Sequence, residues 1–395
     1  MRIITSTDLS EEQEDILLDA PLDGVILILG PPGSGKTVMA FLRAEALVKR
    51  FDAVTLIMYN KVLQTFSKNG TSKKAVDVRT MHSWIWQWWR GIMNGKKAPE
   101  ISRFVYDWNE MFDLLAQKQQ EKSLKLQKVD WEHLIIDEGQ DFTNKMYRFL
   151  DLVRNVFFRG KNIPSLTILA DENQRINEDN STIEDIKNLL HVEDKNVFHL
   201  TKNYRNTDEI NEFIQRFYVG GETGRTKPSG KHGEKPKFIN THSFQETIRY
   251  IKRYIKSHDN EEIAIIVEKN ELRKRYYENL EEQLEESDLY VQTYASNDYQ
   301  WKDTRLLHFD EGGTVTILNK QSCKGLEFDA VFIPELQRID VADDNTLAFK
   351  MEMYVMCSRA RKTLVLMSQN SSGEELPILK HFPKKEENIV EYINV

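Results

Sequence analysis

Short apolar runs alternate with longer stretches of helical periodicity along most of the chain. The apolar runs, rich in Val, Ile and Leu, occupy residues 25–29, 53–58, 133–136, 166–170, 197–200, 237–240, 263–267, 314–318, 330–333 and 363–367. They are continuous rather than alternating, which is typical of strands buried on both faces of a parallel sheet. Helical periodicity occupies residues 37–50, 143–154, 207–217, 244–256 and 271–286. The alternation predicts an α/β fold, and the number of strands favours two consecutive α/β domains.

Three segments depart from this alternation of strand and helix patterns. Residues 83–130 are predicted to be helical without a convincing strand, and they hold five of the seven tryptophans: Trp84, Trp86, Trp88, Trp89 and Trp108. The helical spacing of these rings fits a core, a surface for a partner protein or a platform for stacking nucleic-acid bases. Residues 220–236 form a loop rich in Gly, Pro and Lys, and residues 296–313 are short and irregular.

The composition is that of an ordinary soluble protein. The 395 residues carry 54 Lys and Arg against 62 Asp and Glu, a net charge of −8, so binding of nucleic acid by bulk positive charge is disfavoured, although a local basic groove is compatible with it. Two cysteines, Cys323 and Cys357, cannot form a disulfide framework and are expected to be buried packing residues. No signal peptide or membrane span is expected, which favours the cytoplasm.

A phosphate-binding motif follows the first predicted strand and opens the first long helical stretch. Residues 30–37 read GPPGSGKT and match G-x-x-x-x-G-K-[ST], which assigns nucleotide binding to Gly30, Pro31, Gly33, Ser34, Gly35, Lys36 and Thr37. Inward-turned backbone N–H groups and the helix N-terminus would cradle the phosphates. Lys36 would reach the β and γ phosphates, and the Thr37 hydroxyl would bind Mg²⁺.

An acidic pair ends the strand at residues 133–136. Asp137 and Glu138 follow three apolar residues, the Walker B arrangement. We expect Asp137 to hold Mg²⁺ and Glu138 to orient or deprotonate the attacking water, because phosphoryl transfer depends mainly on positioning and charge.

Further motifs resemble those of the UvrD/Rep/PcrA-like superfamily 1 helicases over almost the whole chain. Asp137-Glu138-Gly139-Gln140-Asp141 is similar to the family's D-E-A-Q-D, with Gly139 in place of Ala. By resemblance, Gln13 and Tyr204 would bind the adenine and Glu327 would lie near the ribose. Gln174, Arg205 and Arg359 would contact the γ-phosphate, the two arginines acting as fingers that stabilise the transferring group.

The same resemblance implies contacts with nucleic acid. Four residues lie in segments that correspond to the family's strand-binding motifs: Asn60, His82, Trp84 and Lys324. The resemblance also implies tandem RecA-like domains, ATP and Mg²⁺ as cofactors, and single-stranded DNA as the track, with RNA left open. The expected boundaries are a first domain in residues 1–82 and 131–200, a reduced helical insertion in residues 83–130, and a second domain in residues 201–395.

Several residues depart from the family pattern. After Gln174 the chain reads Arg-Ile-Asn-Glu-Asp-Asn, where the family carries a base-stacking tryptophan. Base stacking contributes about 1–3 kcal/mol per base, so its loss would weaken or redesign the strand path. Residues 296–313 are too few for the family's second accessory domain. Retained ATP chemistry with altered stepping on nucleic acid is expected.

Two hypotheses follow. One is an ATP-dependent DNA helicase or translocase moving 3′→5′ on a single strand, in DNA repair or anti-phage defence. The other is a helicase-like ATPase that acts as a regulatory switch for a partner protein, such as a nuclease bound through the Trp-rich insertion.

Overall fold

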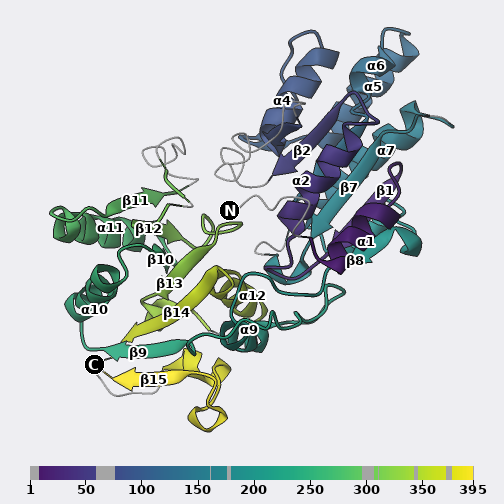
Figure 1. Cartoon of the computed structure of the whole chain (residues 1–395). Helices are drawn as coiled ribbons and strands as arrows, with labels where there is room; N and C mark the ends of the chain where they lie inside the picture. The colour runs from purple at the N-terminus through teal and green to yellow at the C-terminus, as the bar shows by residue number, and fades with distance from the viewer. Residues whose placement is uncertain are drawn as a thin grey trace. The chain divides into compact units, whose positions relative to one another are not determined.

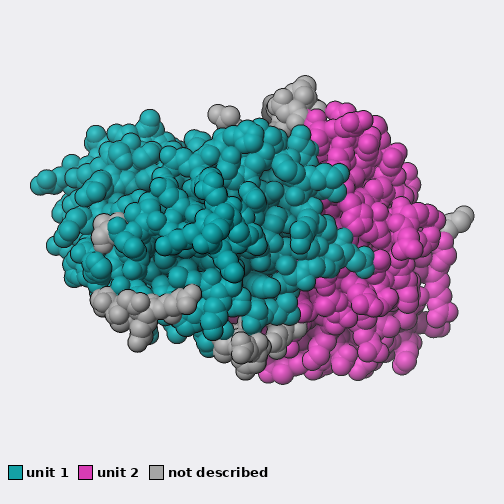
Figure 2. All heavy atoms as spheres, turned by 90° about the horizontal axis from the view of Figure 1, so that it is seen from below, with its two compact units in different colours: residues 1–2, 31–34, 201–395 teal, residues 3–30, 35–200 magenta. Residues whose placement is uncertain are grey.

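The computed structural model describes residues 9–58, 76–160, 162–175, 179–295, 307–309, 311–341, 346–370 and 376–394. The chain divides into two compact units, which Figure 2 distinguishes by colour. Unit 2 comprises residues 3–30 and 35–200, and unit 1 comprises residues 1–2, 31–34 and 201–395.

Unit 2 is built on a six-stranded sheet in which every pairing is parallel. The strand order is β3 (Asp77–Thr80), β2 (Val54–Met58), β6 (His133–Ile136), β7 (Ser165–Ala170), β1 (Val25–Leu29) and β8 (Val197–His199). Strands β1, β2, β6 and β7 are buried along their whole length because helices cover both faces of the sheet.

The helices of unit 2 are α1 (Glu11–Asp19), α2 (Lys36–Leu47), α4 (Met81–Ile92), α5 (Trp108–Gln120), α6 (Leu126–Val129), α7 (Asn144–Phe157) and α8 (Ile183–Leu189). Helix α2 packs against β2, β6 and β7. Residues of α4, α5 and α7 share one hydrophobic core with Val25, Leu27 and Leu29 of β1. The alternate residues Ile26 and Ile28 are equally buried, which explains why β1 is a continuous apolar run.

Unit 1 contains a seven-stranded parallel sheet. Its order is β11 (Tyr290–Tyr294), β12 (Thr314–Asn319), β10 (Glu262–Val267), β13 (Phe328–Ile333), β14 (Ala360–Gln369), β9 (Lys237–Thr241) and β15 (Glu391–Asn394). Helices α10 (Phe244–Ser257) and α11 (Asn270–Leu284) lie along one face, and α9 (Asp208–Ile214) and α12 (Thr346–Cys357) along the other (Figure 1).

The predicted α/β class with two tandem parallel-sheet domains is confirmed. Each predicted strand is present within one or two residues at its start, except that β14 begins three residues earlier. The expectation that residues 83–130 contain no strand is wrong, because β4 (Glu100–Ser102) and β5 (Val105–Tyr106) form an antiparallel hairpin there. None of the helices in the described part of the chain combines the length and apolar character that crossing a bilayer requires.

The Trp-rich helix α4 contributes mainly to the core. Trp84, Trp88 and Trp89 are buried, and Trp84 stacks on Trp88 with ring centroids 5.3 Å apart. Trp86 lies on the opposite side of the helix and is 57% exposed. The core interpretation is therefore confirmed for three of the four tryptophans of this helix.

His133 in β6 ties the stability of unit 2 to pH. The ring is fully buried, and its Nε2 lies 2.9 Å from the Thr167 hydroxyl of β7. Burial, and then the positive charges of Arg43 and Arg154, lower the pKa of His133 to about 3. The folded chain therefore keeps this imidazole neutral at pH values where the unfolded chain, with a pKa of about 6.5, takes up a proton.

We expect the contribution of His133 to the free energy of unfolding to be fully present above pH 6.5 and to be lost as the pH drops towards 3, a change of several kcal/mol because one pKa unit corresponds to about 1.4 kcal/mol. Urea denaturation at several pH values, followed by tryptophan fluorescence, measures this loss. His133→Gln keeps a hydrogen-bonding group without a titrating one and should flatten the profile. A variant profile as steep as that of the wild type would refute the assignment.

Candidate functional site

The polar residues of unit 2 gather at the carboxyl ends of three adjacent strands. The phosphate loop follows β1, Asp137 follows β6 and Asp171 follows β7, and these strands are neighbours in the order β6-β7-β1. Ligands of parallel α/β sheets bind at this edge, where loops and helix N-termini converge.

The phosphate loop positions a buried ammonium group. Lys36 is 7% exposed, and its Nζ donates to the Gly30 carbonyl at 2.6 Å and lies 4.0 Å from an Asp171 carboxylate oxygen. Gly35 caps α2 at φ 88°, in the left-handed region that favours glycine. A Cβ at Gly35 would lie 2.5 Å from the Gln13 amide nitrogen, so the predicted adenine-binding Gln13 packs directly on the loop.

The tip of the loop, residues 31–34, groups with unit 1. Within the tip, the Ser34 hydroxyl donates to the Pro31 carbonyl at 2.8 Å, and Gly33 has a φ of 76°. These contacts shape the turn between β1 and α2.

Thr37 and Asp137 form a pair of hard oxygen donors. The Thr37 hydroxyl donates to Asp137 Oδ2 at 2.8 Å, and Asp137 is 1% exposed. Burial, and then the charge of Glu138, raise the pKa of Asp137 to about 7, against the Thr37 hydrogen bond and the positive charge of Lys36. A cation at this point would relieve the cost of ionising the carboxylate. One hydroxyl and one carboxylate suit Mg²⁺, which takes its remaining ligands from water and phosphate.

A buried network extends from Glu138 to Gln174. Glu138 accepts a hydrogen bond from the Gln140 amide at 2.7 Å, and the Gln140 carbonyl oxygen accepts one from the Asp171 N–H at 2.9 Å. Asp171 in turn accepts from the Gln174 amide at 2.7 Å, and burial raises the pKa of Asp171. Glu138 adopts a left-handed backbone conformation, φ 54° and ψ 47°, which is strained for this residue type.

Three predicted site residues, Lys36, Glu138 and Gln174, therefore belong to one polar network, in which an ion pair links Lys36 to Asp171 and hydrogen bonds link the others. Sequence reasoning did not assign roles to Asp171 and Gln140, which link them. Gln140 lies inside the quoted motif at residues 137–141, and Asp171 lies three positions before Gln174, so their positions near predicted residues were the available signal.

Gly139 explains one departure from the family motif. A Cβ on this residue would lie 2.4 Å from a methyl carbon of Ile168 and 3.0 Å from the Tyr147 hydroxyl. That hydroxyl donates to the Gly139 carbonyl at 2.6 Å. The alanine found in the resembling motif does not fit here unless the side chain of Ile168 or the backbone beside it shifts.

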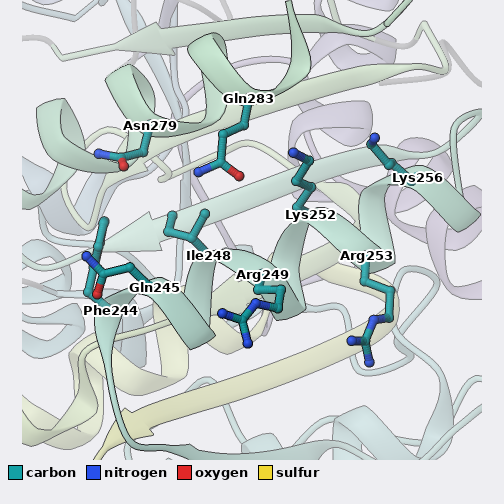
Figure 3. Close-up of a pocket in the computed structure, with 9 residues that line it drawn as sticks. All are labelled: Phe244, Gln245, Ile248, Arg249, Lys252, Arg253, Lys256, Asn279 and Gln283. Carbon is teal, nitrogen blue, oxygen red and sulfur yellow. The ribbon is translucent and has the colours of Figure 1, made fainter.

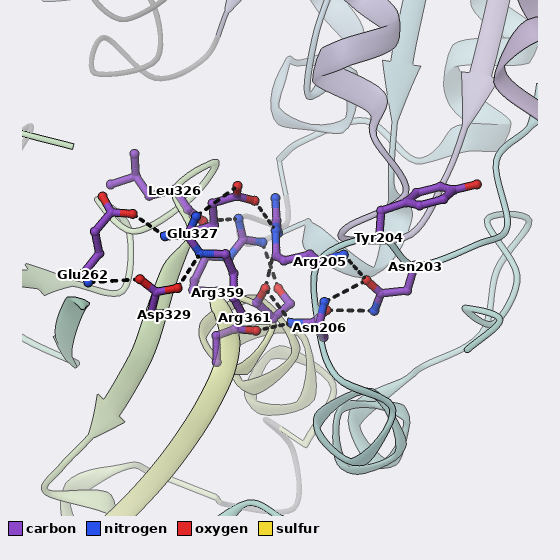
Figure 4. Close-up of polar contacts among 12 residues, drawn as sticks. Asn203, Tyr204, Arg205, Asn206, Glu262, Leu326, Glu327, Asp329, Arg359 and Arg361 are labelled. Carbon is purple, nitrogen blue, oxygen red and sulfur yellow. Dashed lines mark hydrogen bonds and ion pairs between the residues drawn. The ribbon is translucent and has the colours of Figure 1, made fainter. Parts of the chain in front are cut away.

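In unit 1, the predicted arginine finger Arg205 is held by a carboxylate (Figure 4). Arg205 Nε donates to Glu327 Oε2 at 2.7 Å, and its backbone N–H donates to Asn203 Oδ1 at 2.8 Å. Burial alone would raise the pKa of Glu327, but the charges of Arg205 and Arg361 and the hydrogen bond from Arg205 hold it below its usual value. The resemblance places Glu327 near the ribose, and in this structure that carboxylate binds Arg205.

The second predicted finger, Arg359, is almost fully buried. Its guanidinium donates to the Val355 and Leu326 carbonyls at 2.8 and 3.3 Å and to the Ser358 hydroxyl at 2.9 Å. Arg361, which the sequence analysis left without a role, bonds to Glu262 and lies 3.5 Å from Asp329.

The Tyr204 ring points away from the Arg205–Glu327 pair (Figure 4). The loop at residues 220–236 is hydrogen-bonded to the segment that carries Tyr204. Lys231 Nζ donates to the Tyr204 carbonyl at 2.7 Å, and the Asp208 carboxylate accepts from the backbone N–H groups of Ser229 and Gly230. Two basic residues of this loop are thus engaged with the chain itself, since Arg225 also lies over the Tyr218 ring, 5.6 Å from its centroid.

The predicted nucleic-acid contacts are only partly accessible. Trp84 and Lys324 are 4% and 2% exposed, because their motif positions lie inside the packed units, and contact of either residue with a strand stays a prediction. His82 is half-buried, with Nδ1 3.3 Å from the Tyr106 hydroxyl, and burial lowers its pKa. Asn60 lies outside the described residues.

Comparison with known proteins finds a family match in the first half of the chain. Residues 13–180 match a protein family described as an AAA domain, which includes the phosphate loop, Asp137 and Gln174. Among solved structures, the C-terminal domain of a possible DNA helicase from Lactobacillus plantarum WCFS1 matches with 20% identity and a TM-score of 0.34, covering 48% of this chain and 98% of that one. No curated protein matches the chain.

Replacing Gly139 with alanine should destabilise unit 2 by about 1–3 kcal/mol, the usual cost of overpacking. Gly91→Ala is the matched control, because nothing lies within 4 Å of a Cβ on this exposed position of helix α4. The control should be neutral or stabilising by up to about 1 kcal/mol. Urea denaturation followed by tryptophan fluorescence compares them, and equal stability of Gly139→Ala and wild type would contradict the close packing.

Proposed function

We propose that this protein is an ATP-dependent motor of the superfamily 1 helicase type, which hydrolyses ATP and moves along single-stranded DNA in the 3′→5′ direction. The observation that carries the proposal is the buried network that joins Lys36 to Gln174 beside the Thr37–Asp137 pair. The AAA-domain match over residues 13–180 supports a nucleoside triphosphate as the ligand.

In this proposal, Lys36 and the loop N–H groups bind the phosphates, and Gln13 and Tyr204 contact the base. Thr37 and Asp137 would hold Mg²⁺, which neutralises phosphate charge when it is bound. Glu138, oriented by Gln140, accepts a proton from the attacking water. Gln174 reports the γ-phosphate to Asp171, because the two side chains share a hydrogen bond.

Arg205 and Arg359 of unit 1 supply positive charge to the transferring phosphoryl group in the proposed cycle. Arg205 must leave Glu327 to do so, and Arg359 must leave the three oxygens that it binds. Release of these contacts would free both guanidinium groups for the phosphoryl group, and it would thereby couple hydrolysis to movement of unit 1.

ATP hydrolysis by the wild-type protein should rise at least tenfold on addition of single-stranded DNA, and Lys36→Ala should remove both the basal and the stimulated rates. Phosphate release, measured with DNA and RNA oligonucleotides of the same sequence in parallel, tests this and identifies the sugar. A basal rate unaffected by either strand would refute the motor.

Glu138→Gln separates nucleotide binding from hydrolysis. The amide can keep the contact with Gln140 but cannot accept a proton, so we expect ATP affinity within a few-fold of wild type and hydrolysis lowered by about 10²–10⁴-fold. Fluorescent ATP binding and single-turnover hydrolysis measure the two effects. Comparable hydrolysis by Glu138→Gln and wild type would remove Glu138 from the proposed role.

A regulatory switch is the second candidate function. The insertion exposes several large apolar residues: Trp86, Ile101, Phe104 and Val105. Such side chains suit a protein partner, for example a nuclease. DNA-independent hydrolysis that changes on addition of a co-purifying protein would favour the switch over the motor.

A further inference from the structure

A basic groove lies between α10 and α11 of unit 1, with a volume of about 550 Å³ (Figure 3). Phe244 and Ile248 form its buried floor. Four cationic side chains of α10 line it: Arg249, Lys252, Arg253 and Lys256. The lining contains no carboxylate.

The sequence of α10 makes these cations a continuous row. The helix buries Ile248, Ile251 and Ile255 against the sheet, and the cations occupy the positions between them. Residues three or four apart on a helix lie about 5 Å apart along its axis. Arg249 to Lys256 therefore presents positive charge over roughly 10 Å, in repeats of one helical turn.

The four cations of the row are not paired with carboxylates in the described part of the chain. Within the described part of the chain, no ion pair involves any of these four cations, whereas Lys320 pairs with Glu352 and Arg361 with Glu262 elsewhere in unit 1. In a chain of net charge −8, a groove with four cations and no acid is a marked local excess.

The opposite wall supplies neutral donors. Asn279 and Gln283 of α11 line the groove across from α10, and the Lys252 side chain rises towards Gln283 (Figure 3). Amide groups of this kind donate to phosphate oxygens and to base edges. Cations on one wall and amides on the other suit a linear phosphate polymer.

The far side of α11 limits what can lie in the groove. A second groove there, of about 520 Å³, is lined by Glu278, Glu281, Glu282 and Glu285. These carboxylates repel a polyanion that extends beyond α11. A single strand that follows α10 avoids them, whereas a wide duplex would approach them.

We infer that the α10–α11 groove binds the phosphate backbone of single-stranded nucleic acid. This inference rests on the proposed motor function and adds a track contact that none of the motif residues provides. The groove holds the strand by charge and gives no sequence preference. Charge contacts in this groove would offset the loss of the base-stacking residue after Gln174.

Arg249→Gln/Arg253→Gln removes two exposed cations from the groove. The matched control is Lys49→Gln/Lys380→Gln, which removes the same charge at exposed positions outside it. Anisotropy of a fluorescent 20-nucleotide oligo-dT, without nucleotide and at several salt concentrations, reports the affinity of the full chain. For single strands, each phosphate contact contributes about −0.7 to the slope of log K against log salt.

The groove variant should therefore flatten the slope by about 1.4 and weaken binding at 50 mM salt by roughly ten- to hundredfold. The control should keep the wild-type slope and lose little affinity. Equal effects of the two variants would overturn the inference, as would no binding of oligo-dT by wild type. Altered self-association of the groove variant in sedimentation, with unchanged strand affinity, would also overturn it and indicate a second copy as the occupant.

The outcome separates this inference from the proposed motor. If DNA stimulates hydrolysis but Arg249→Gln/Arg253→Gln binds the strand as the wild type does, the groove inference is wrong and the motor proposal still holds. If the groove variant loses strand affinity but DNA does not stimulate hydrolysis by the wild type, the motor proposal is wrong and the groove inference still holds.

Discussion

Burial of charged groups at the carboxyl edge of the unit 2 sheet is the constraint on which the rest depends. Lys36, Asp137 and Asp171 are each less than 10% exposed, and a buried charge is costly unless it is paired and hydrogen-bonded. Thr37 and Gln174 donate hydrogen bonds to the two carboxylates, and the Gly30 carbonyl accepts one from Lys36, which makes this burial tolerable. The raised pKa of Asp137 shows that the compensation is incomplete, and a nucleotide with its cation would complete it.

The central strands of both sheets could be predicted from the sequence, but several edge strands could not. Central strands such as β1 and β10 are apolar throughout because helices cover both faces. The strands β3, β11 and β15, which were not predicted, are all edge strands. Each carries polar or exposed residues, so its sequence lacks the apolar run that distinguishes a strand from a loop. The hairpin at β4 and β5 was missed for a similar reason, because most of its residues are exposed.

Motifs located the phosphate-binding residues because their chemistry requires contiguous residue types. They did not reveal accessibility, which depends on packing: Trp84 and Lys324 sit in recognisable motifs and are nevertheless buried. Pairings between distant segments were equally hidden, and the contact between Arg205 and Glu327 joins residues 122 positions apart. The sequence predicted α10 as a helix, but it did not predict the groove, because the second wall of the groove comes from the neighbouring α11.

The central claim is that the buried network is a site for a nucleoside triphosphate with Mg²⁺. Calorimetric titration with a non-hydrolysable ATP analogue, with Mg²⁺ and then with excess chelator, tests it without relying on turnover or a strand. The account predicts saturable binding to the wild type that weakens at least tenfold without Mg²⁺ and is lost in Lys36→Ala. Absence of Mg²⁺-dependent binding to the folded wild-type protein would contradict it.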